Sequence, residues 1–327
     1  MQLFGLAVAL IVSLVFAPLG SEAQQVAKIP KVGVLEPTPR QHLAPCIFAF
    51  QQGLHHLGYV EEQNILVDYR YGEGRPDRLP ALARELVQRG PDVLWTHSNP
   101  AALALKQATT TLPIVVGVAI DLTAMGLTES LAHPGGNLTG LELRPADLAG
   151  KRLQLFKEAL PTITRVAILV DPAWTAHTSI PRIIEQEART LGVQLQRVEA
   201  RTPADFEAAF AAMDRRKSNA LMIMESEVFA AHRQQLQTLA LRHRFPSMSY
   251  GPHHAEAGSL LAYGADPRDL CERSATFVHK ILRGAKPADL PIERADKFPL
   301  VINLKTAHML GVTIPQTFLL RADQVIE

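Results

Sequence analysis

The sequence predicts an α/β fold made of two similar, doubly wound parallel-sheet lobes. Short apolar strands alternate with amphipathic helices through the first half of the chain, and the same series recurs in the second half. Gly58 and Pro113 of the first series are separated from Gly192 and Pro246 of the second by almost the same number of residues. Equal spacing through whole strand–helix units favours two lobes over one large sheet. Two lobes leave a cleft between them, where the carboxyl ends of parallel strands can bind a ligand.

The strands are recognised as short apolar runs. The first series comprises residues 31–35, 65–69, 92–96 and 113–117, and the second comprises 165–170, 195–198, 220–224 and 245–248. The run 166–170 is continuously apolar, which is typical of a parallel strand covered by helices on both faces. Two further strands are predicted at 259–263 and 298–303.

The helices are recognised by apolar residues that recur three or four positions apart. Gly58 ends the first helix and Gly192 ends its counterpart in the second lobe, as glycine often does. We expect the apolar stripes to face the two cores: Ile47, Phe50, Leu54 and Leu57; Leu79, Leu82, Ala83 and Leu86; Ile180, Ile184, Ala188 and Leu191; Phe206, Phe210 and Met213; Leu236, Leu239 and Ala240; Leu270, Phe277, Ile281 and Leu282.

The N-terminus has the pattern of a secretory signal peptide. Residues 3–16 are almost wholly apolar, and small residues at Ser21 and Ala23 form a cleavage site. We therefore expect residues 1–23 to be removed near Ala23 and the mature chain to be periplasmic. The apolar run is shorter than the ~20 residues that a membrane-spanning helix needs. No Lys or Arg precedes it, so an uncleaved anchor or a misplaced start codon is the alternative.

Charge and motifs exclude several classes of function. The formal net charge of +1 gives no electrostatic case for a nucleic-acid partner. Gly72 and Gly74 begin a glycine-rich turn, but Pro76 and Asp77 interrupt the dinucleotide-binding pattern. No nucleophile elbow, HExxH or CxxC motif occurs. We expect no catalytic residue, no metal and no cofactor.

The two cysteines, Cys46 and Cys271, could pair in an oxidising compartment. Cys46 lies in the first helix, and Cys271 lies in a late helix that could return to the same lobe. The sequence does not supply the close Cα approach that a disulfide requires, so we favour two buried free thiols.

Short motifs recur along nearly the whole mature chain, at residues 53–65, 74–80, 99–102, 106–109, 131–140, 150–153, 229–233, 284–291 and 300–307. These segments resemble the ABC transporter substrate-binding family related to the tryptophan- and tyrosine-binding proteins. The resemblance implies a type I periplasmic-binding-protein fold with three crossovers between the lobes, and a small ligand trapped by lobe closure. We expect an N-terminal lobe of residues 24–142 plus 265–290 and a C-terminal lobe of 143–264 plus 291–327.

Candidate ligand-binding residues follow the strands of the first lobe. Glu36 and Thr38 lie just past the first strand, and Ser98 and Asn99 lie between the third strand and its helix. Asn99 can cap that helix, whose free N–H groups would favour an anion; a cap without a ligand is the alternative. Asp121 could pair with an amino group, although Leu122 stands where the family has proline.

The second lobe supplies the other candidates. Asp171 follows a strand at a position where the family carries Asn, and Trp174 could either stack on a ligand ring or pack within its loop. Glu225 and Ser226 end the next strand, and Tyr250 lies near the lip of the cleft. All of these assignments depend on strand-end position.

The sequence therefore predicts a monomeric solute-binding protein that delivers a small ligand to an ABC transporter permease. An amino acid or a related aromatic metabolite is the ligand class that we favour. A ligand-sensing subunit for a membrane receptor or sensor kinase is the main alternative, and a periplasmic hydrolase is a third.

Overall fold

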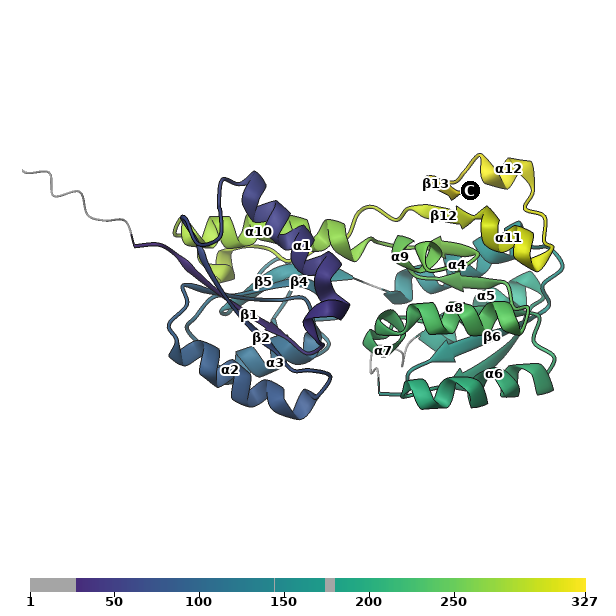
Figure 1. Ribbon diagram of the computed structural model, residues 1–327, viewed down its shortest axis with the longest axis horizontal. Coiled ribbons are helices and arrows are strands. Elements are labelled where there is room, and N and C mark those ends of the chain that lie inside the picture. Colours follow the sequence, from purple (N-terminus) through teal and green to yellow (C-terminus); the bar gives the residue numbers. More distant parts are fainter. Residues whose placement is uncertain (1–27, 144, 174–179) are drawn as a thin grey trace, which may run out of the picture.

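Two separate β-sheets form the centres of two lobes that lie side by side (Figure 1). The computed structural model describes residues 28–143, 145–173 and 180–327. The predicted fold class, two doubly wound α/β lobes, is confirmed. Among the described residues, no helix combines the length and apolarity needed to cross a membrane.

The N-terminal lobe is built on a six-stranded sheet in the order β11-β5-β4-β3-β1-β2, in which every described pairing is parallel. Its strands are β1 Lys31–Glu36, β2 Leu66–Tyr71, β3 Val93–Thr96, β4 Ile114–Ile120, β5 Leu138–Leu143 and β11 Glu293–Arg294. Its helices are α1 Arg40–His56, α2 Leu79–Gln88, α3 Asn99–Ala108 and α10 Pro267–Leu282, with 3-10 turns η2 Pro76–Arg78 and η5 Pro287–Asp289.

The C-terminal lobe is built on a seven-stranded sheet in the order β13-β12-β10-β9-β8-β6-β7, in which only β12 and β10 pair antiparallel among the described strands. Its strands are β6 Arg165–Val170, β7 Gln194–Glu199, β8 Ala220–Ile223, β9 Ser247–Ser249, β10 Leu261–Tyr263, β12 Leu300–Asn303 and β13 Gln324–Ile326. Its helices are α4 Pro145–Ala159, α5 Ile180–Leu191, α6 Phe206–Arg215, α7 Glu227–Ala231, α8 Arg233–Arg242, α9 Pro252–Glu256, α11 Leu304–Leu310 and α12 Gln316–Leu319, with a 3-10 turn η4 Pro203–Asp205.

The strand order reverses at equivalent places in the two sheets. In the first sheet the reversal lies between β1 and β3, and in the second it lies between β6 and β8. Connections leave the two flanking strands in opposite directions at such a point, so a crevice opens beyond their carboxyl ends. The predicted strand-end residues therefore follow the correct strands.

The chain crosses between the lobes three times: from β5 to α4, from β10 to α10, and from β11 to β12. One predicted boundary is wrong. We expected residues 291–327 to belong to the C-terminal lobe, but β11 pairs with β5 and Ile292 is buried in a core of the N-terminal lobe. A two-residue strand has too little apolar pattern to be recognised in a sequence.

Helices α1 and α10, far apart in sequence, pack against each other beside the first sheet (Figure 1). Gly53 allows this close approach, because a Cβ atom there would lie 2.3 Å from the carbonyl oxygen of Glu272. Contrary to our expectation of free thiols, Cys46 and Cys271 form a disulfide across this contact, with Cα atoms 5.6 Å apart. The packing of the two helices supplies the proximity that the sequence could not.

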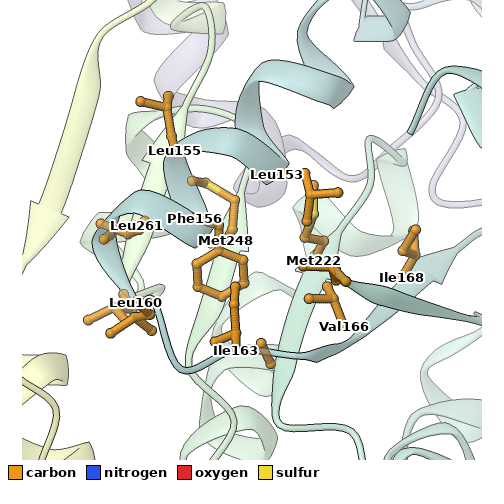
Figure 2. Packing of buried hydrophobic residues seen from close by; sticks show 14 of the residues in the cluster. Leu153, Leu155, Phe156, Leu160, Ile163, Val166, Ile168, Met222, Met248 and Leu261 are labelled. Carbon is orange, nitrogen blue, oxygen red and sulfur yellow. The ribbon is translucent and has the colours of Figure 1, made fainter. Parts of the chain in front are cut away.

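The larger core of the C-terminal lobe lies between α4 and the second sheet. Figure 2 shows Phe156 of α4 beside Met248 of β9, with Leu153 and Met222 close by. Phe156, Leu153 and Met248 are all fully buried. This packing fixes α4, the first helix after the first crossover, against the sheet.

The disulfide leads to a stability prediction. Replacing Cys46 and Cys271 together by alanine is expected to lower the free energy of unfolding by ~2–5 kcal/mol, because the bond closes a long loop in the unfolded chain. Urea unfolding of the oxidised protein followed by circular dichroism measures the difference. Reductant should destabilise the native sequence by a similar amount and leave the double variant unchanged. Two reactive thiols in the denatured, unreduced protein would contradict the bond.

Candidate functional site

A cavity of about 210 Å³ lies between the lobes at the carboxyl ends of the strands. Both lobes contribute its walls, as the strand order predicts. An apolar part of the lining is formed by Pro45, Val118, Ile120, Leu143, Ala231 and Pro267. Polar and charged side chains from both lobes complete it.

Glu36 ends β1 but does not face the cavity. Its fully buried carboxylate accepts hydrogen bonds from the backbone N–H of His97, at 3.0 Å, and the hydroxyl of Thr96, at 3.4 Å. Its other oxygen lies 2.5 Å from Nδ1 of His97. The carboxylate therefore holds the end of β3, and it is His97 that lines the cavity. Strand-end reasoning passed over His97, although it directly follows the strand.

Thr38, Ser98 and Asn99 all line the cavity. The Thr38 hydroxyl is buried and has no hydrogen-bond partner among the described residues. Ser98, rather than Asn99, caps α3: its backbone is extended, with φ −136° and ψ 147°, and its side chain accepts from the N–H of Ala101. Asn99 instead exchanges two hydrogen bonds with the backbone of Ile120, at 2.7 and 3.0 Å, and so fastens α3 to β4.

In the C-terminal lobe, Ser226 connects three loops at the carboxyl end of the sheet. Its hydroxyl donates to Asp171 at 2.8 Å and accepts from the N–H of Val228, which begins α7. The hydroxyl of Tyr250 donates to the carbonyl of Ser226 at 3.1 Å. Burial raises the pKa of Tyr250 far above its usual value, so this hydroxyl stays protonated. Ser226 and Tyr250 line the cavity, whereas Asp171 lies behind them.

Glu225 also lines the cavity and forms an ion pair behind it. Its Oε1 lies 2.5 Å from Nη1 of Arg152, and both side chains are almost fully buried. Its Oε2 is buried and has no hydrogen-bond partner among the described residues. Sequence reasoning named the carboxylate but not the arginine, which comes from α4.

Within the described parts of the chain, two charged residues of the lining have no ion-pair partner. Arg233 donates one hydrogen bond to the carbonyl of Ala230, at 2.9 Å, and no ion pair is recorded for it among the described residues. Glu227 has neither a side-chain hydrogen bond nor an ion pair in the described parts of the chain. Arg233 lay within a family-like motif, so the motif itself was the signal that could have identified it.

His97 and Glu227 face the same cavity from opposite lobes and influence each other. Burial raises the pKa of Glu227 to about 7; the positive charge of His97 opposes this rise, and the negative charges of Glu36 and Asp171 add to it. Burial lowers the pKa of His97, but the adjacent Glu36 carboxylate outweighs burial, so the net pKa is raised. Glu227 is thus close to half ionised at neutral pH in the ligand-free site.

Residues at the second crossover also line the cavity. Arg268 binds Asp266 and, at 2.9 Å, Glu256 of α9, so an ion pair connects α10 to the C-terminal lobe. His253 lies nearby with Nδ1 buried and unpartnered among the described residues. Burial lowers the pKa of His253 to about 4, and the charge of Arg233 adds to this effect, so the ring is neutral at neutral pH.

Of the predicted ligand-binding residues, six line the cavity: Thr38, Ser98, Asn99, Glu225, Ser226 and Tyr250. Glu36, Asp171 and Asp121 do not; Asp121 follows β4 with a positive φ of 49°. Trp174 lies outside the described residues. Within the described ranges, no group of three or more His, Cys, Asp or Glu side chains is arranged to hold a metal.

Two doubly wound lobes with a polar cavity between their strand ends are characteristic of a type I periplasmic binding protein. The chain belongs to the ABC transporter substrate binding protein family, whose model matches residues 31–326. The family resemblance in the sequence is thereby confirmed.

Similar proteins support this assignment. A tyrosine-binding protein of Clostridioides difficile (strain R20291) is 21% identical over 264 residues, covering 80% of this chain and 75% of that protein. A domain in complex with L-Trp from Streptococcus pneumoniae superposes with a TM-score of 0.83 at 26% identity, covering 91% of this chain and 99% of the other. A conserved domain protein from Vibrio cholerae superposes with a TM-score of 0.84 at 29% identity, covering 91% and 100%.

The pKa of Glu227 predicts how the stability of the ligand-free protein depends on pH. Because the folded chain holds this proton more tightly than the unfolded chain, whose carboxyl has a pKa near 4.5, stability should fall as pH rises from 4.5 to about 7. His97 contributes a further loss, but above pH 6.5.

Glu227→Gln should therefore remove most of the decrease below pH 6.5, as measured by urea unfolding at a series of pH values. Glu207→Gln is the matched control, since Glu207 pairs with Arg242 on the surface of the same lobe. A Glu227→Gln profile parallel to that of the native sequence would show that Glu227 is not the titrating group.

Proposed function

We propose that this protein is an exported solute-binding protein that traps a zwitterionic amino acid with an aromatic side chain and delivers it to an ABC permease. The single observation that carries the ligand assignment is a pair of charged side chains on the cavity wall, Arg233 and Glu227, which have no ion-pair partner within the described ranges. Both are partly buried, and a ligand that supplies the two opposite charges would stabilise the site, because a charge removed from water without a partner is costly.

Each charge suits one end of an amino acid. The planar guanidinium of Arg233 can bind an α-carboxylate through two parallel hydrogen bonds. The carboxylate of Glu227 can accept hydrogen bonds from an α-ammonium group, which would also draw this carboxyl towards its ionised form. A net-neutral ligand thereby leaves the net charge of the cavity unchanged.

The remaining lining suits the side chain of such a ligand. Val118, Ile120 and Leu143 present apolar surface. The unsatisfied Oε2 of Glu225 and the hydroxyl of Thr38 can each accept a hydrogen bond from a ring N–H or O–H. The relatives that bind tyrosine and L-Trp support an aromatic amino acid. A cavity of about 210 Å³ admits a small molecule and not a long oligomer.

The mechanism that we infer is binding by lobe closure. Arg233 and Glu227 belong to the C-terminal lobe, whereas His97, Val118 and Ile120 line the cavity from the N-terminal lobe. A ligand that contacts both walls favours the closed arrangement by its differential affinity. The apolar N-terminal segment supports export, and the family supports an ABC permease as the recipient of the closed, loaded protein.

The test uses the mature chain, residues 24–327, and compares L-tryptophan and L-tyrosine with two analogues by isothermal titration calorimetry. Tryptamine lacks the carboxylate and indole-3-propionate lacks the amine. Both analogues should bind at least about 100-fold more weakly than L-tryptophan, because each leaves one buried charge unpaired. Arg233→Met should weaken L-tryptophan binding by a similar factor and leave tryptamine binding nearly unchanged.

Arg242→Met is the matched control, because Arg242 lies on the same helix as Arg233 but on the surface. It should bind L-tryptophan like the native sequence. Equal affinity for L-tryptophan, tryptamine and indole-3-propionate, or no binding of any amino acid, would refute the zwitterion assignment.

A further inference from the structure

Arg152 occupies an unusual position for a charged residue. It lies on α4, directly after the first crossover, and is 2% exposed. Its neighbours Leu153 and Phe156 are locked into the core that Figure 2 shows, so the helix that carries the guanidinium is fixed against the sheet. A buried arginine requires partners on all sides.

The guanidinium of Arg152 contacts three groups. Its Nε donates to the carbonyl oxygen of Tyr263 at 2.7 Å. Its Nη1 lies 2.5 Å from Oε1 of Glu225. Its Nη2 lies against Gly264, where a Cβ atom would be only 3.1 Å away. Any side chain at residue 264 would crowd the guanidinium.

Some of these partners belong to the crossovers between the lobes, and Glu225 belongs to the lining of the cavity. Tyr263 ends β10 and Gly264 begins the second crossover to α10. The ring of Tyr263 also lies 6.5 Å from the ring of Phe298, in the third crossover. Glu225 lines the ligand cavity and turns an unsatisfied oxygen, Oε2, away from the ion pair. The guanidinium of Arg152 therefore connects Glu225, in the wall of the cavity, to the segments that join the lobes.

We propose that Arg152 is a positioning residue of the hinge, which holds the second crossover at Tyr263 and Gly264 in register with the cavity carboxylate Glu225. The rigid fork of a guanidinium can satisfy a carboxylate and a carbonyl at fixed angles simultaneously, whereas a lysine ammonium acts as a single point charge. A ligand that donates to Glu225 thereby acts on the group that restrains the hinge. This link to the ligand rests on the proposed function, but the restraint of the hinge does not.

The test measures hydrogen exchange of the peptide 261–270 in the ligand-free mature chain. The variant R152M/E225Q removes both charges together, so no buried carboxylate is left unpaired. Exchange in this peptide should become about tenfold faster or more, because the restraint on the Tyr263 carbonyl is lost. The peptide 206–215, which is helix α6, should exchange as in the native sequence.

Two variants separate this role from a general loss of structure. E225Q alone keeps the bond between Arg152 and Tyr263 but removes the carboxylate partner of the guanidinium, so exchange at 261–270 should rise less than in R152M/E225Q. K151M removes a positive charge from the same turn of α4, where Lys151 donates a hydrogen bond to Gln154, and should have no effect. If R152M/E225Q does not fold, R152K tests the proposal in its place, because lysine keeps the charge but lacks the planar guanidinium. Exchange at 261–270 should be faster in R152K as well.

Unchanged exchange at 261–270 in the folded Arg152 variant would overturn the proposal, whether or not L-tryptophan binds. Faster exchange there, together with no binding of L-tryptophan or L-tyrosine by the native sequence, would refute the proposed ligand and leave the hinge role of Arg152 supported.

Discussion

The cost of burying charge between two lobes governs how this site is built. A charged group removed from water loses several kcal/mol of solvation unless a partner of opposite charge and hydrogen bonds replace it. Each lobe offsets this cost with an ion pair between its own residues: Glu36 with His97 in the N-terminal lobe, and Glu225 with Arg152 in the C-terminal lobe. These pairs organise the strand ends, and of Glu225 only Oε2 stays without a hydrogen-bond partner among the described residues. The charges open to a ligand are Arg233 and Glu227, which have no ion-pair partner within the described ranges.

Most of the fold could be predicted from the sequence, because buried parallel strands and their covering helices produce patterns that extend over many residues. The strand pattern also led to Thr38, Glu225 and Tyr250, which line the cavity, since strand order determines which loops meet. It could not tell which polar residues at a strand end turn inward to hold a neighbouring strand. Glu36 and Asp171 do so, and the choice depends on side-chain distances that a sequence does not contain.

Residues contributed from elsewhere in the chain were the hardest to predict. Arg152 and Arg233 reach the site from helices, so strand-end position gives no hint of them. Cys46 and Cys271 become neighbours only because α10 returns to the first lobe and Gly53 permits close packing there. Strand β11 is too short to produce a pattern, so the boundary near residue 291 depended on pairing with β5.

The same contacts determine which parts of the molecule can move during closure. The disulfide and the packing of Gly53 bind α10 rigidly to the N-terminal lobe, although α10 follows the second crossover. The core around Phe156 likewise fixes α4 to the C-terminal lobe immediately after the first crossover. Relative motion of the lobes must therefore be absorbed in a few residues of each crossover, because the elements on either side are held by their cores. A restraint on Tyr263 acts where that motion is concentrated, so one side chain there can influence the balance between open and closed arrangements more than a similar contact within either lobe.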